Sequence, residues 1–71
     1  MYQVYGRKRH YEMPFTAYET RNKQSALNEL NEHTDKQYTL SDMPKKNEEK
    51  RFRSKYPDCL WIYVSNFKKE Y

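Results

Sequence analysis

The chain has few of the residues that make tight turns, disulfides and aliphatic cores. Its 71 residues include one glycine, three prolines and one cysteine, which excludes an internal disulfide and a glycine-rich phosphate loop. Leucine, isoleucine and valine together number only seven. No apolar run approaches the roughly 18 residues of a membrane span, and the first residues carry no apolar signal segment. These absences predict a cytoplasmic protein that does not enter membranes.

Aromatic rings and charges dominate what remains. The chain has eight tyrosines, three phenylalanines and one tryptophan, and 34% of its residues are charged. Disordered chains are poor in aromatic residues, and each buried ring removes roughly 150 to 250 Å² from water. We therefore expect one small folded domain over residues 1–67, with a tyrosine-rich core, followed by a frayed tail over residues 68–71.

The most apolar stretch, residues 59–64, is the centre of the predicted fold. Strand side chains alternate between the two faces of a sheet. One face therefore carries Leu60, Ile62 and Val64, and the other carries Cys59, Trp61 and Tyr63. A strand that is apolar on both faces belongs in the middle of a sheet.

Periodicity along the rest of the chain predicts three further strands and two helices. The strands are expected at residues 2–5, 11–19 and 36–40, and the helices at 23–33 and 45–56. Pro14 places the second strand at an edge, because proline cannot donate to an inner ladder. The fold class is α+β, with the order β-β-α-β-α-β and a four-stranded mixed sheet.

The two predicted helices have different roles. Helix 23–33 carries an apolar stripe and a start capped by Asn22 or Thr20. It covers the sheet face that holds Val4, Phe15, Ala17, Leu60, Ile62 and Val64. Helix 45–56 is basic, ends before Pro57, and offers only Phe52 and Tyr56 as apolar anchors. Either these two rings cover Trp61 and Tyr63, which we favour, or this helix stands away and leaves that face exposed.

Enzymatic chemistry finds little support in the sequence. Cys59, His10 and His33 are too scattered for a metal site, so no metal or cofactor is expected. A lone cysteine that opens a buried strand is typical of a core residue rather than a nucleophile. The adjacent Glu48 and Glu49 lie among lysines and arginines, as surface ion-pair partners do. We expect a protein without enzymatic activity.

Positive charge and exposed rings give two sets of candidate binding residues. Segment 45–55 holds six basic and two acidic residues, an excess of 6 − 2 = 4 that equals the net charge of the chain, +4. The candidate partner-binding residues are Trp61, Tyr63, Tyr5, Tyr18, Lys45, Lys46, Lys50, Arg51, Arg53 and Lys55. The alternative set, for nucleic-acid phosphates, is Arg7, Lys8, Arg9, Lys50, Arg51 and Arg53. Tyrosine, tryptophan and arginine dominate protein interfaces, whereas basic residues interleaved with rings also suit nucleic acids.

The composition resembles that of small accessory proteins of bacteriophages that infect low-GC Gram-positive hosts. The run Tyr11-Glu12-Met13-Pro14-Phe15-Thr16-Ala17, with Glu19-Thr20 and Ala26-Leu27, resembles the strand-to-helix junction of small phage inhibitors of host RNA polymerase. The same region also resembles the arm-binding domain of phage integrases, which reads DNA with its sheet. The first resemblance implies a phage-encoded protein that inhibits a host protein, protein–nucleic acid complex or defence complex in the bacterial cytoplasm. The alternative is a small DNA- or RNA-binding protein that uses segment 45–55.

Overall fold

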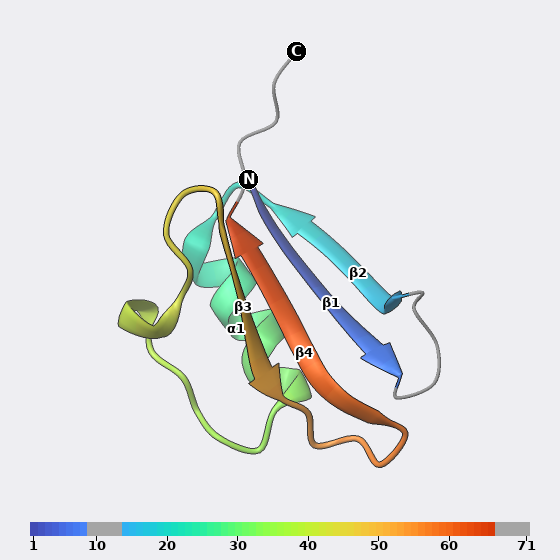
Figure 1. The fold of residues 1–71 in the computed structure, drawn as a ribbon. Helices are drawn as coiled ribbons and strands as arrows, with labels where there is room; N and C mark the ends of the chain where they lie inside the picture. The colour runs from blue at the N-terminus through green and yellow to red at the C-terminus, as the bar shows by residue number, and fades with distance from the viewer. Residues whose placement is uncertain (9–13, 67–71) are drawn as a thin grey trace.

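A computed structural model describes residues 1–8 and 14–66, without the side chains of Lys8 and residues 14–17. The predicted tail at 68–71 lies outside the described residues. The described chain forms a four-stranded sheet with one helix behind it (Figure 1). The elements are β1 (Tyr2–Lys8), β2 (Pro14–Thr20), α1 (Lys23–His33), a short 3-10 helix (Leu40–Asp42), β3 (Glu48–Arg53) and β4 (Cys59–Asn66). The predicted α+β class is confirmed.

The sheet has the strand order β2-β1-β4-β3, and all its neighbouring strands are antiparallel. The predicted mixed sheet is therefore wrong. β4 lies in the interior of the sheet, as its apolar run predicts, and β2 with Pro14 lies at an edge. Two hairpins, β1-β2 and β3-β4, meet along β1 and β4, so the centre of the sheet joins strands that are far apart in sequence.

Helix α1 begins and ends at the predicted residues. The Asn22 side chain accepts a hydrogen bond from the Ser25 backbone N–H at 3.1 Å, which caps the first turn. Ala26, Leu27 and Leu30 form its buried stripe. The first turn has no acidic residue to complement the helix dipole. Packing against the sheet therefore supplies most of the stability of this helix.

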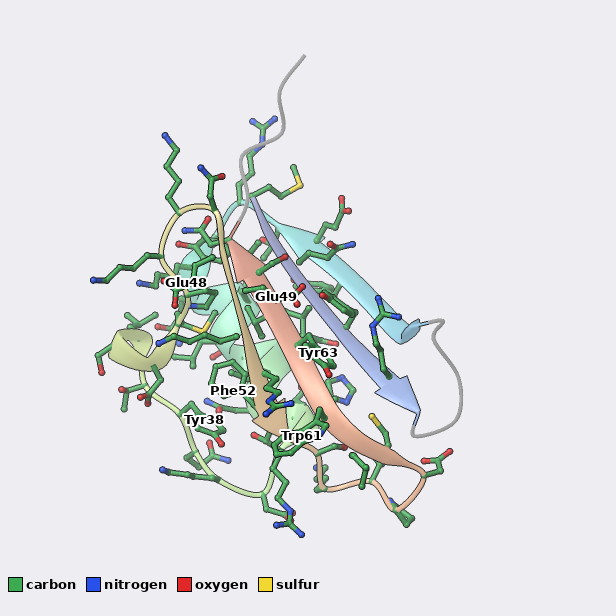
Figure 2. All side chains as sticks on the ribbon, in the orientation of Figure 1. Tyr38, Glu48, Glu49, Phe52, Trp61 and Tyr63 are labelled. Carbon is green, nitrogen blue, oxygen red and sulfur yellow. The ribbon has the colours of Figure 1, made fainter. Side chains whose placement is uncertain are left out.

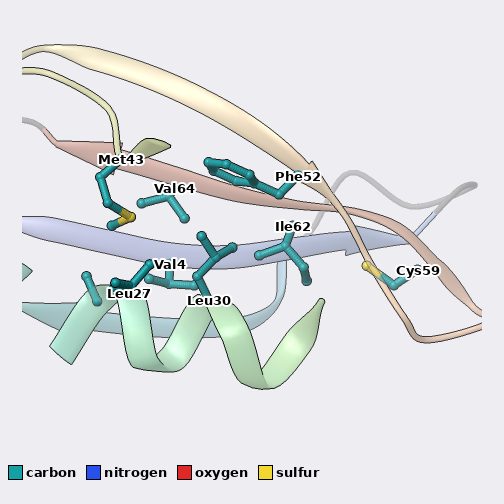
Figure 3. Packing of buried hydrophobic residues seen from close by; sticks show 9 residues of the cluster. Val4, Leu27, Leu30, Met43, Phe52, Cys59, Ile62 and Val64 are labelled. Atoms are coloured by element: carbon teal, nitrogen blue, oxygen red, sulfur yellow. The ribbon is translucent and has the colours of Figure 1, made fainter. Parts of the chain in front are cut away.

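The core lies between the sheet and α1 (Figure 3). Its buried members come from α1, from β1 and β4, from the edge strand β3 and from the segment before β3. They are Val4, Ala26, Leu27, Leu30, Met43, Phe52, Cys59, Ile62 and Val64. Segment 34–47 brings Met43 into this cluster on the β3 side, and the Tyr38 ring meets the Phe52 ring edge-on, with centroids 4.6 Å apart. Each large aliphatic residue in the core contributes about 1.5 to 3 kcal/mol through burial.

The predicted second helix and the predicted strand at 36–40 are wrong. Residues 48–53 form β3, and residues 40–42 form the 3-10 helix in place of a strand. Phe52 and Tyr56 cannot anchor a helix together, because Phe52 pairs with Ile62 across the hairpin while Tyr56 lies in the turn beyond β3. The pairing with β4 overrides the helix propensity of the lysines and glutamates here.

A bulge in β4 reverses the expected sides of Cys59 and Leu60. The β1-β4 register pairs Arg7 with Trp61 and Lys8 with Cys59, which leaves Leu60 as an extra residue. A one-residue slip moves side chains to the opposite face. Cys59 is therefore in the core, whereas Leu60 is 45% exposed.

Candidate binding face of the sheet

The sheet presents one face that no described element covers. Helix α1 and the core lie on the other side (Figure 1). We call the uncovered side the open face. The strand registers arrange its side chains in three rows that run across the strands. The basic row is Arg7, Trp61 and Arg53; the tyrosine row is Tyr5, Tyr63 and Arg51; the acidic row is Glu19, Gln3, Ser65 and Glu49.

The centre of the open face is a pair of stacked tyrosine rings. The Tyr5 and Tyr63 centroids lie 5.5 Å apart with an interplanar angle of 12°. The Tyr5 hydroxyl donates a hydrogen bond to the Glu49 carboxylate on β3. Tyr5 is buried even though it lies outside the core cluster, since its neighbours on the face cover it. The stack and the hydrogen bond therefore hold β1, β4 and β3 together from the side opposite α1.

Three arginines surround these rings. The Arg51 guanidinium carbon lies 4.9 Å from the centroid of the Trp61 ring, and that of Arg7 lies 5.6 Å from the Tyr5 ring. Arg53 is the exposed neighbour of Trp61 on β3. Within residues 1–8 and 14–66, the structure has no carboxylate at ion-pair distance from these three arginines. Each guanidinium has five N–H donors that suit carboxylates or phosphates.

Charge changes sign along the open face. Neighbouring rows are two residues apart on each strand, which is about 7 Å. Two arginines flank Trp61 at one end, and Glu19 and Glu49 lie at the other (Figure 2 labels Trp61, Tyr63 and Glu49). The face is thus basic at one end, aromatic in the middle and acidic at the other end.

The structure brings together members of both predicted binding sets. Tyr5, Trp61, Tyr63, Arg51 and Arg53 from the partner-binding set share the open face with Arg7 from the nucleic-acid set. The preferred expectation that Phe52 and Tyr56 cover this face is wrong. Phe52 is buried on the α1 side, and the Tyr56 ring lies 5.6 Å from the His33 ring.

The remaining predicted residues lie elsewhere. Tyr18 pairs with Val4 and Lys50 pairs with Val64, which places both on the α1 side of the sheet. Lys45, Lys46 and Lys55 are exposed in the segments that flank β3. The side chain of Lys8 and all of Arg9 lie outside the described residues.

Sequence reasoning missed the acidic row. From the sequence, Glu49 is expected only to be a surface carboxylate beside Glu48, and Glu19 is assigned no role. The two glutamates lie on opposite edge strands, with Gln3 and Ser65 between them. The sequence does contain a signal for this row. If residues 48–53 are read as a strand, Glu49, Arg51 and Arg53 alternate and therefore lie on one face of the sheet.

The described residues outside the open face provide no comparable candidate site. The Cys59 thiol is buried and lies 3.2 Å from each of the Arg7 and Trp61 carbonyl oxygens, which satisfies its weak donor. The described residues contain no group of three or more potential metal-ligating side chains. No helix in the described part of the chain has the length and apolarity needed to cross a bilayer.

Comparison with known proteins returns no relative. No family model, curated protein or solved structure matches the chain.

Proposed function

We propose that this is a non-enzymatic binding protein that acts by occupying the surface of another protein with its open face. The observation that carries the proposal is the cluster of Arg7, Arg51 and Arg53, with no carboxylate partner among the described residues, around Trp61 and Tyr63. Tryptophan, tyrosine and arginine are the residue types that contribute most at protein interfaces.

Two features favour a protein target over a nucleic acid. The faces of the aromatic rings are already in contact with one another or with guanidinium groups, so they do not form an open platform for bases. The acidic row would repel a polyanion laid along the strands, whereas a protein surface can present both signs of charge. In the setting that the composition resembles, the target is a host protein or defence complex, which the bound protein inhibits.

Affinity capture from a bacterial lysate, with and without nuclease, tests this proposal. We expect a protein partner that stays bound after nuclease treatment. Titration with the purified partner should show that Trp61→Ala costs about 2 kcal/mol or more, which is about 30-fold in Kd. Arg53→Ala should also weaken binding without affecting the fold, since Arg53 is exposed.

Leu40→Ala is the matched control, because Leu40 is 43% exposed and lies outside the open face. It should leave the Kd unchanged. Equal binding by Trp61→Ala, Arg53→Ala and Leu40→Ala would show that the open face is not the binding surface.

Nucleic-acid binding is a second candidate, favoured by the three arginines. Three phosphate contacts would make log K fall with log salt at a slope of about 2 on a single strand. A mobility-shift series across salt concentrations measures that slope. If micromolar protein leaves a single-stranded oligonucleotide unshifted at low salt, this candidate fails.

A further inference from the structure

We infer that the open face is complementary to itself and that two copies of the chain pair through it. The charge order of the face suggests this arrangement. A two-fold axis that runs across the strands through the tyrosine row turns the basic row of one copy over the acidic row of the other. Dimers with a two-fold axis are the commonest homo-oligomers, and in them the same surface of each copy forms the interface.

The register identifies the groups that meet. Arg53 and Glu49 are both on β3, two residues apart and on the same face. Rotation about the tyrosine row therefore places Arg53 of each copy over Glu49 of the other, and the contact occurs twice. Glu49 already accepts the Tyr5 hydroxyl, but a carboxylate accepts several donors, so it can also bind a guanidinium.

The centre of the interface is aromatic. Tyr63 lies on the axis and meets Tyr63 of the second copy, with the buried Tyr5 ring stacked beside it. Trp61 lies opposite the strand position of Ser65. Arg51 also lies on the axis, where it would face Arg51 of the second copy. Its guanidinium group instead lies over the Trp61 ring, and thus toward the acidic row of the second copy. Stacked sheets of this kind lie about 10 Å apart with their strands aligned to within about 30°.

The size of the face sets the strength of the pair. Four strands at about 4.8 Å spacing and three rows at about 7 Å spacing span about 15 by 14 Å. That is small beside the roughly 800 Å² per partner of a standard interface. The dimer is therefore weak and concentration-dependent, and a tighter-binding target displaces the second copy. Pairing keeps the rings of the open face out of water until the target is met.

Sedimentation equilibrium of the full chain over a range of concentrations tests the inference. We expect a reversible monomer–dimer equilibrium. Arg53→Glu places two carboxylates opposite each other and should weaken the dimer about tenfold or more, as should Glu49→Arg by pairing two guanidinium groups. Lys45→Glu changes the net charge by the same amount as Arg53→Glu in an exposed turn away from the face, and should leave the equilibrium unchanged.

Mixing the two face variants is the decisive measurement. Each is a poor dimer alone, but a mixture of Arg53→Glu with Glu49→Arg re-forms both cross-axis ion pairs and should recover dimers close to the unmodified level. Circular dichroism establishes that both variants are folded. A monomer at every concentration, or a mixture that stays monomeric although the unmodified chain dimerises, would overturn the inference. Neither result bears on the binding of a target protein, which needs only a free open face.

Discussion

Phe52→Ala is the substitution whose expected effect follows most directly from the structure. Phe52 is 6% exposed, and its ring meets Tyr38 edge-on at 4.6 Å. Replacing a buried phenylalanine by alanine costs about 3 to 5 kcal/mol, of which the ring pair accounts for about 0.5 to 1.5 kcal/mol. Phe52 lies on an edge strand, where water can enter the space that the ring leaves. We therefore expect the free energy of unfolding to fall by about 3 kcal/mol.

That loss is large for this domain. A chain of this length has a free energy of unfolding of roughly 4 to 11 kcal/mol. Urea denaturation followed by Trp61 fluorescence and circular dichroism measures the change. Leu40→Ala, at a side chain that is 43% exposed, is the control and should change the free energy of unfolding by less than about 0.5 kcal/mol. If Phe52→Ala is too unstable to titrate, Phe52→Leu should still cost about 1 kcal/mol.

The same substitution tests how β3 is held on the sheet. Phe52 is the only buried residue of β3, so its loss should loosen the strand that carries Arg51 and Arg53. Hydrogen exchange at the β3 amides should then accelerate more than exchange in β1. A loss of stability below about 1 kcal/mol would refute the reasoning, because it would mean that backbone pairing and the Tyr5–Glu49 hydrogen bond hold this strand without the Phe52 ring.

Two further substitutions test the core and the 3-10 helix. Ile62→Ala in the central strand should cost about 2 to 5 kcal/mol, as expected for a buried aliphatic residue that is 1% exposed, and unchanged thermal melting would contradict the central position of β4. Hydrogen bonds from the Thr39 backbone N–H and hydroxyl to the Asp42 carboxylate lower the pKa of Asp42 below its ordinary value of 3.8. Because the pKa is lower in the folded state, the charged Asp42 carboxylate stabilises the fold at pH values above its ordinary pKa of 3.8. This stabilisation is lost as the pH falls through the lowered pKa. The difference in urea midpoint between the unmodified protein and Asp42→Asn should thus be largest near neutral pH and shrink in acid; a difference that grows in acid would count against the assignment.

Local signals in the sequence predicted the parts of the fold that depend on local interactions. The apolar stripe and the Asn22 cap located α1, and the missing N–H of Pro14 placed β2 at an edge. The apolar run at residues 59–64 placed β4 in the interior of the sheet. Each of these features is decided by neighbours within a few residues.

Residues 48–53 could not be assigned in that way. Five of these six side chains are charged, and they favour a helix when taken alone. Their pairing with β4, in which Phe52 lies opposite Ile62, makes them a strand. The bulge at Leu60 has the same origin, because it exists only in the register between β1 and β4.

The binding face was predicted in its parts but not as a whole. Alternation alone placed Tyr5, Trp61 and Tyr63 off the main core. The position of Arg7 beside Trp61 depends on the strand order, which no local pattern contains. The sequence therefore predicts the partner-binding and the nucleic-acid-binding residues as two separate sets, although members of both lie on the same face of the sheet.

The pairing of β1 with β4 has a consequence for how the chain folds. These strands are the first and the last of the described fold, so the centre of the sheet forms only when segments about 60 residues apart meet. Chains dominated by such distant contacts fold slowly for their size, in milliseconds to seconds rather than microseconds. During synthesis, the β1-β2 hairpin and α1 leave the ribosome before β4 exists, and the inner edge of β1 stays unpaired during that interval. The chain can therefore complete its core only after translation has passed β4, and until then a chaperone or a second nascent chain can reach the edge that β4 later occupies.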